Sequence, residues 1–198
     1  ATSASRVLGF VREAMIAAIL GAGPVADAFY AAFRFPNLFR RLFAEGAFNS
    51  AFVPLFAKEV ESQGKEAAAE FAGDVFSALF AVLLVLTLGA IIFMPALVST
   101  IIAPGFTDTP DKFTLTTELA QIMFPYLAAM SIVAMLSGIL NSFRSYFIAA
   151  IAPVALNVAM IGALAASAWF DLPARQTGYA LAGAVIVAGL LQLAILIF

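Results

Sequence analysis

Cysteine and histidine are both absent from the 198-residue sequence. Their absence excludes disulfides, thiol chemistry, most zinc sites and a Ser-His-Asp relay, and it leaves the redox compartment unspecified. Charge is also scarce, because Asp, Glu, Lys and Arg make up 11% of the chain, against about 25% in a soluble domain. The net charge of −2 shows no basic excess, so nucleic acid is not expected as a partner.

Long apolar runs take the place of the missing charge. The segments 75–107, 119–143, 145–170 and 176–198 contain no charged residue. A membrane-spanning helix needs about 20 predominantly apolar residues, and each of these runs exceeds that length. Hydrophobic residues make up 64% of the chain and the mean hydropathy is +1.04. The composition therefore predicts a membrane protein.

The fold class expected from this pattern is all-α, a polytopic bundle of about six transmembrane helices. Charged segment 58–74 is expected to be a water-exposed loop, and Pro36, Pro54, Pro95 and Pro125 are expected to bend or interrupt helices. Both chain ends fall in helical or apolar runs, which predicts a piece of a longer polytopic protein. The expected spans are about 1–20, 27–57, 70–103, 113–143, 145–170 and 177–198.

Basic residues between these spans separate into two groups. One set of loops carries Lys58, Lys65 and Arg144, and the other carries Lys112 and Arg175. Cytoplasmic loops of membrane proteins hold an excess of Lys and Arg. The loop with Lys58 is therefore expected in the cytoplasm.

A charged stripe runs along the second expected helix, from Asp27 to Pro54, and most of it falls within "FRFPNLFRRLFAEGAFNSAFVP" (33–54). At about 100° per residue, most of its polar side chains fall on one face, with Arg40 about 140° away from Asp27. The phenylalanines between them are expected to pack outward, away from this face. The polar members are Asp27, Arg34, Asn37, Arg41, Glu45 and Asn49.

Charged residues also occur in the first expected helix. Arg6 and Glu13 are seven residues apart and share a face, while Arg12 lies roughly 100–120° from them. The short turn at 21–26 is expected to make the first two helices antiparallel neighbours, so that their polar stripes face each other. The two helices then supply up to five arginines against the acids Glu13, Asp27 and Glu45.

Two interpretations of these arginines are open. An arginine at bilayer depth costs roughly 2.5–3.5 kcal/mol on insertion scales, so several are not expected to face lipid. In the first interpretation the arginines form structural ion pairs or lie at headgroup level, and Arg41–Glu45 is a natural i,i+4 pair. In the second interpretation they line a cavity. Guanidinium groups bind phosphate bidentately and keep their charge, which suits a cavity for a diphosphate.

Small and polar residues within the later spans predict helix contacts. Amides in apolar spans are expected to form inter-helix hydrogen bonds, and small residues allow helices to approach closely. The amides are Gln121, Asn141, Asn157 and Gln192. The small residues are Ala159, Ala163 and Ala166 in one span and Gly178, Ala182 and Gly189 in the next.

Three motifs carry a resemblance to a known family. They are "SRVLGFVRE" (5–13), "GAGPVADAFYAAFRFPNLFRRLFAEGAFNSAFVP" (21–54) and "APGF" (103–106). With these motifs the chain resembles the MurJ (MviN) family of bacterial lipid II flippases, in the multidrug/oligosaccharidyl-lipid/polysaccharide exporter superfamily. The resemblance implies that residues 1–198 form the N-terminal lobe of a two-lobe transporter, with the second lobe outside this chain.

The resemblance also implies site residues. Arginines matching Arg6, Arg12 and Arg40 line a central cavity in the family and engage the diphosphate. Asp27 and Glu45 match acidic positions, and Asp27 is expected to orient arginines or to gate the outer side. Asn37 and Arg41 are expected as further residues that orient the cavity.

The activity implied by the resemblance is flipping of lipid II, a polyprenyl-diphosphate glycopeptide, across the bacterial inner membrane by alternating access. The expected partners are lipid II, membrane lipids and the second lobe of the same protein. No enzymatic activity and no cofactor are expected in the chain, and the membrane potential or an ion gradient is the expected drive.

Other functions stay open on the residues alone. A sibling exporter of another polyprenyl-diphosphate glycan or of a drug would share the fold, although cationic drugs favour acids over arginines in the cavity. A structural membrane subunit would use its arginines only for internal pairing. An enzyme acting on polyprenyl phosphates is disfavoured, because such an enzyme needs clustered acids for Mg²⁺, and the close pair Asp108 and Asp111 falls in an expected loop.

Overall fold

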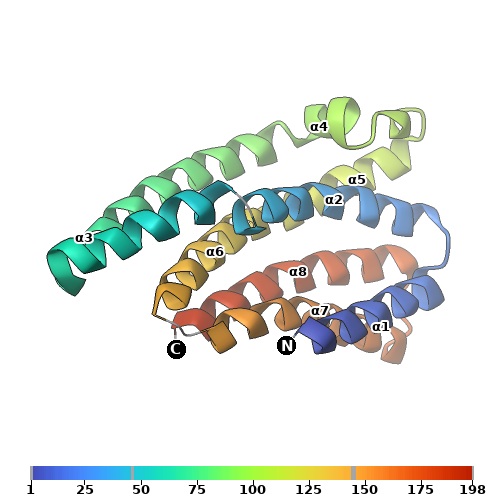
Figure 1. Cartoon of the computed structure of the whole chain (residues 1–198). Coiled ribbons are helices and arrows are strands. Elements are labelled where there is room, and N and C mark those ends of the chain that lie inside the picture. The colour runs from blue at the N-terminus through green and yellow to red at the C-terminus, as the bar shows by residue number, and fades with distance from the viewer. Residues whose placement is uncertain (1, 46, 144–145, 198) are drawn as a thin grey trace.

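Helices form the architecture of this computed structural model (Figure 1). The structure describes the backbone of residues 2–45, 47–143 and 146–197, and the side chains of 5–37, 50–143 and 154–197. Within these ranges no strand is present, so the all-α prediction is confirmed. The elements are α1 (Thr2–Leu20), α2 (Pro24–Glu45), α3 (Ala47–Ile92), α4 (Met94–Leu97), the π-helix η1 (Val98–Ile102), the 3-10 helix η2 (Pro104–Phe106), α5 (Pro110–Met123), α6 (Tyr126–Ser142), α7 (Tyr146–Trp169) and α8 (Ala174–Ile197).

The element α3 is a helical hairpin that turns at Gly64 (Figure 1). Gly64 has φ 92° and ψ 179°, a conformation that only glycine adopts without strain. The two arms return side by side, since the Phe52 and Phe71 rings stack at 6.1 Å. The prediction of a loop over 58–74 is therefore wrong. Its Ala, Glu, Lys and Gln residues are strong helix formers, and a single glycine is enough to reverse the chain.

The boundaries of two other expected spans also differ from the structure. The expected span 27–57 is divided between α2 and the first arm of α3. The expected span 113–143 is broken into α5 and α6 at Pro125, because proline has no N–H to continue the helical bonding. That proline behaves as predicted. Pro36, in contrast, lies inside α2 without interrupting it.

Lys65 lies at one end of the molecule, and Lys112 and Arg175 lie at the other, as the sequence predicted. Arg144 lies outside the described residues. The tip of α3 lies near the end of α6, with Lys65 Nζ 6.0 Å from the centre of the Phe143 ring. The α1–α2 turn, the start of α5 and the α7–α8 turn gather at the other end (Figure 1). At this second end Arg175 Nη2 lies 3.2 Å from Glu118 Oε2. Which end faces the cytoplasm stays a prediction.

Helix α8 packs against α7, α6 and α5. Gly189 is buried against α6, where a Cβ atom would lie 3.0 Å from both Ala129 Cβ and Tyr126 Cδ2. The predicted close packing of small residues is thus confirmed for α8. On α7, however, Ala166 is exposed, so the prediction is wrong for that residue.

Three helical stretches of the described residues are long and apolar enough to span a membrane. They are Ser50–Ile92, Pro110–Ser142 and Ala174–Ile197, and Val154–Trp169 is a shorter apolar helix. The second arm of α3 carries exposed apolar side chains such as Val85 and Ile92, which is the surface expected of a helix in contact with lipid. The chain is a multi-pass membrane protein.

Candidate functional site

Arg12 is held in a polar network that begins with its neighbour in α1. Arg12 Nε donates to Glu13 Oε1 at 3.2 Å, and Arg12 Nη2 lies 2.5 Å from the same oxygen. The Arg12 side chain is only 16% exposed, although it lies on the first helix of the chain. The nearby carboxylate offsets part of the cost of desolvating this guanidinium.

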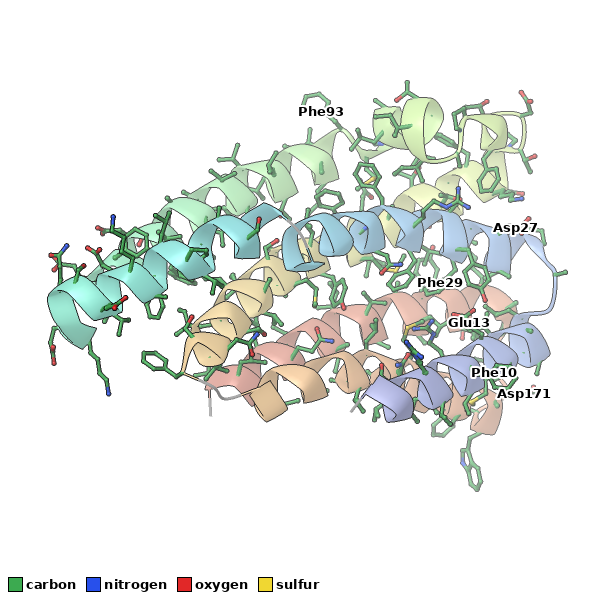
Figure 2. The ribbon with its side chains drawn as sticks, in the orientation of Figure 1. Phe10, Glu13, Asp27, Phe29, Phe93 and Asp171 are labelled. Atoms are coloured by element: carbon green, nitrogen blue, oxygen red, sulfur yellow. The ribbon has the colours of Figure 1, made fainter. Side chains whose placement is uncertain are left out.

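Glu13 also connects α1 to α2. Tyr30 Oη donates to Glu13 Oε2 at 2.7 Å, and Figure 2 shows Glu13 between the two helices. Both carboxylate oxygens of Glu13 therefore have partners. Tyr30 was missed in the sequence, although at about 100° per residue it lies about 60° from Asp27, next to the charged stripe.

Asn157 of α7 is the third residue that contacts this network, after Glu13 of α1 and Tyr30 of α2. Its side chain is buried, and Arg12 Nη1 donates to Asn157 Oδ1 at 2.9 Å. Asn157 Nδ2 in turn donates to the Ser5 carbonyl oxygen at 3.1 Å. The prediction that Asn157 forms an inter-helix hydrogen bond is confirmed, and its partner is a predicted site residue.

The hydrogen bonds of Arg12 leave part of its guanidinium available. A guanidinium has five N–H donors, and the three recorded bonds use one N–H on each nitrogen. Among the described residues, no further acceptor is recorded for the remaining N–H groups of Nη1 and Nη2. One N–H on Nη1 and one on Nη2 therefore stay unused by these bonds, and guanidinium N–H groups are strong donors to phosphate oxygens.

The other predicted residues are only partly covered by the described structure. Arg6 and Arg34 are exposed, and Asn37 is half-buried. None of the contacts recorded for the described residues pairs Arg6 or Arg34 with a carboxylate. The remaining members of the predicted set lie outside the described side chains, so the structure says nothing of their contacts: Arg40, Arg41, Glu45 and Asn49.

The prediction that α1 and α2 are antiparallel neighbours with facing polar stripes holds only in part. The two helices are consecutive, but α1 packs mainly against α7, while α2 packs mainly against α5 and α6. Figure 1 shows them diverging from the turn that joins them. The Tyr30–Glu13 bond is the described polar link between them. Among the described phenylalanines of α2, Phe29 is fully buried, and Phe33 and Phe35 are partly buried against the core of the bundle.

Asp27 contacts a lysine in this structure. Lys112 Nζ lies 2.6 Å from Asp27 Oδ2, and the same ammonium group lies 4.0 Å from the centre of the Phe106 ring. The pair therefore fastens the start of α2 to the start of α5 at the end of the bundle that holds the α1–α2 turn. The recorded partner does not match the expectation that Asp27 orients an arginine, whereas a position at one end of the bundle is compatible with gating.

We predict a weak coupling between Asp27 and Lys112. The Asp27 side chain is 59% exposed, and exposed ion pairs contribute about 0.2–1 kcal/mol. A double-mutant cycle with Asp27→Ala and Lys112→Ala, measured by thermal unfolding of detergent-purified protein, should give a coupling energy within that range. A coupling above about 2 kcal/mol would show that the pair is far less exposed to solvent than its surface area indicates.

An apolar cavity lies apart from the arginine network. It has a volume of about 320 Å³ and lies between α2, the second arm of α3 and the α5–α6 junction. The Phe35 and Phe124 rings on its wall stack at 5.9 Å. None of its lining residues is charged: they are Phe35, Val85, Leu86, Gly89, Ala90, Phe93, Leu97, Phe124 and Leu127.

The described residues contain no metal-binding group of three or more His, Cys, Asp or Glu side chains. The polar chemistry of the described part of α1, α2 and α7 consists instead of guanidinium, carboxylate, amide and phenol groups. Arg6, Arg12 and Arg34 carry three positive charges and Glu13 one negative charge, while Asp27 is paired with Lys112. Among the described side chains of α1 and α2, three arginines therefore stand against two carboxylates.

Comparisons with known proteins agree on one family. The sequence model described as "Lipid II flippase MurJ" matches residues 16–198. The chain is 56% identical over 195 residues to a "Probable lipid II flippase MurJ" of Rhizobium tropici, covering 98% of this chain and 37% of the relative. It is 43% identical over 192 residues to the "Lipid II flippase MurJ" of Burkholderia cenocepacia, covering 96% of this chain and 36% of the relative.

A solved structure has the same fold. The chain matches "Lipid II flippase MurJ, inward closed conformation" with a TM-score of 0.81 and 24% sequence identity, covering 99% of this chain and 40% of that one. The chain thus spans a little over a third of the length of the curated relatives that it matches.

Proposed function

The chain belongs to the MurJ family of lipid II flippases, and from that premise we propose that it is the N-terminal lobe of a protein that moves lipid II across the bacterial inner membrane. The observation that carries this proposal is Arg12. A permanently charged guanidinium is held by Glu13 and Asn157 and still has N–H groups to offer to a phosphate.

In this proposal the diphosphate of the lipid enters from the cytoplasmic side and is bound by Arg6, Arg12 and Arg40. Charge-assisted hydrogen bonds from arginine are stronger than those between neutral groups, and they become stronger where water is excluded. Asp27, Asn37, Arg41 and Glu45 orient or gate the cavity. The second lobe of the full-length protein closes the cavity on its other side.

Transport in this proposal follows alternating access. The two lobes rock against each other around a fixed site, which exposes the headgroup to the far side of the membrane. The polyprenyl tail stays in the lipid phase, because transfer of its apolar surface to water is unfavourable. Members of the family are named as flippases, which are transporters and not enzymes. We propose the membrane potential or an ion gradient as the drive, without a bound cofactor.

Complementation tests the cargo. The full-length protein, expressed in cells depleted of their own lipid II flippase, should restore growth and prevent accumulation of lipid II in the inner leaflet. Protein that reaches the membrane but does not restore growth would contradict lipid II as the cargo. It would favour instead an exporter of another polyprenyl-diphosphate glycan, or a structural subunit.

A further inference from the structure

We propose that Asn157 is a positioning residue for Arg12, and that it sets the direction in which the guanidinium presents its remaining N–H groups. This inference rests on the proposed function, because it concerns the binding of a diphosphate by Arg12. It assigns to α7 a role in a site that the sequence places only on the first two helices.

The Asn157 side chain is buried, and both of its polar atoms are hydrogen-bonded. The residue is 5% exposed within a mostly apolar helix. Burying an amide without hydrogen bonds is unfavourable, because the group loses its bonds to water. Both polar atoms of Asn157 have partners, since Oδ1 accepts from Arg12 at 2.9 Å and Nδ2 donates to the Ser5 carbonyl at 3.1 Å.

The Ser5 carbonyl determines which way the amide faces. A backbone carbonyl only accepts hydrogen bonds, so the side-chain nitrogen of Asn157 must point toward it. The side-chain oxygen of Asn157 is then turned toward Arg12. An aspartate at this position would place a carboxylate oxygen against the Ser5 carbonyl, and its charge would compete with an anionic ligand for Arg12.

Arg12 is consequently fixed from two directions. Glu13 binds the Nε and Nη2 edge, and Asn157 binds Nη1. Glu13 is itself held by Tyr30 of α2. A long, flexible arginine side chain loses rotamer entropy when it is immobilised. Contacts that fix it before the ligand arrives reduce this cost of binding.

Binding of a polyprenyl diphosphate to the purified full-length protein in nanodiscs tests the role of Asn157. Asn157→Ala should weaken binding about tenfold, equivalent to about 1.4 kcal/mol. Asn157→Asp, which preserves the shape of the side chain, should weaken it at least as much. Combined with Arg12→Ala, Asn157→Ala should have no further effect, because a positioning residue acts through the residue that it positions.

Ser167→Ala is the matched control, since Ser167 is a buried polar residue of the same helix and takes no part in the recorded bonds of Arg12. It should bind the probe as the unmodified protein does. Unchanged binding by folded Asn157→Ala and Asn157→Asp, together with loss of binding in Arg12→Ala, would overturn this inference and leave the proposed function standing. Unchanged binding in Arg12→Ala would overturn the proposed function itself.

Discussion

Arg12→Ala in the full-length protein should abolish its ability to support growth of cells depleted of their own lipid II flippase, and lipid II should accumulate. The substitution removes a fixed charge and the N–H groups proposed to bind the diphosphate. A hydrogen bond to a charged group contributes about 1.5–3 kcal/mol, so loss of two such bonds weakens binding by at least about a hundredfold. The measurement is growth together with lipid II content at matched expression in the membrane.

One further variant separates the geometry of Arg12 from its charge, and a second serves as a control at another arginine. Arg12→Lys keeps the charge and loses the planar fork, so it should restore growth only partly. Arg175→Ala removes an arginine that lies against Glu118 and Tyr179 at one end of the bundle, and it should support growth normally. Full growth of folded Arg12→Ala would show that the Arg12 network is structural.

Gly189→Leu should destabilise the lobe. Even the first added carbon atom would lie 3.0 Å from Ala129 Cβ and Tyr126 Cδ2. Ala129 Cβ is attached directly to the backbone of α6, so helix α8 would have to move away. Overpacking of a dense core costs about 1–3 kcal/mol, and sometimes more. We expect a lower melting temperature and reduced membrane expression, with Gly189→Ala showing a smaller loss of the same kind.

Gly183 provides a matched control on the same helix. A Cβ atom built there has no heavy atom within 4 Å, and alanine favours a helix over glycine by about 0.8–1.0 kcal/mol. Gly183→Ala should therefore leave the melting temperature unchanged or raise it. Equal losses of stability at Gly183 and Gly189 would show that helix propensity, and not the contact with α6, governs α8.

Several features of the fold were predictable because they depend on local sequence. Apolar runs predict membrane helices by length alone. Pro125 separates α5 from α6 because proline has no backbone N–H to donate to the carbonyl of the preceding turn. The failure at 58–74 has a related cause. A run of charged residues is typical of a loop, but the residues around Gly64 have high helix propensity, and charged side chains are equally compatible with an exposed helix. Polarity alone does not distinguish the two.

Composition and motifs by themselves determined that this protein is a helical membrane protein of the MurJ family with arginines in its first two helices. Only the tertiary structure decided which groups hold Arg12. Asn157 is 145 residues away along the chain, and its neighbourhood depends on the packing of α1 against α7. Asp27 likewise meets Lys112, 85 residues away. Helical periodicity assigns a residue to a face, but the partner across that face depends on long-range packing.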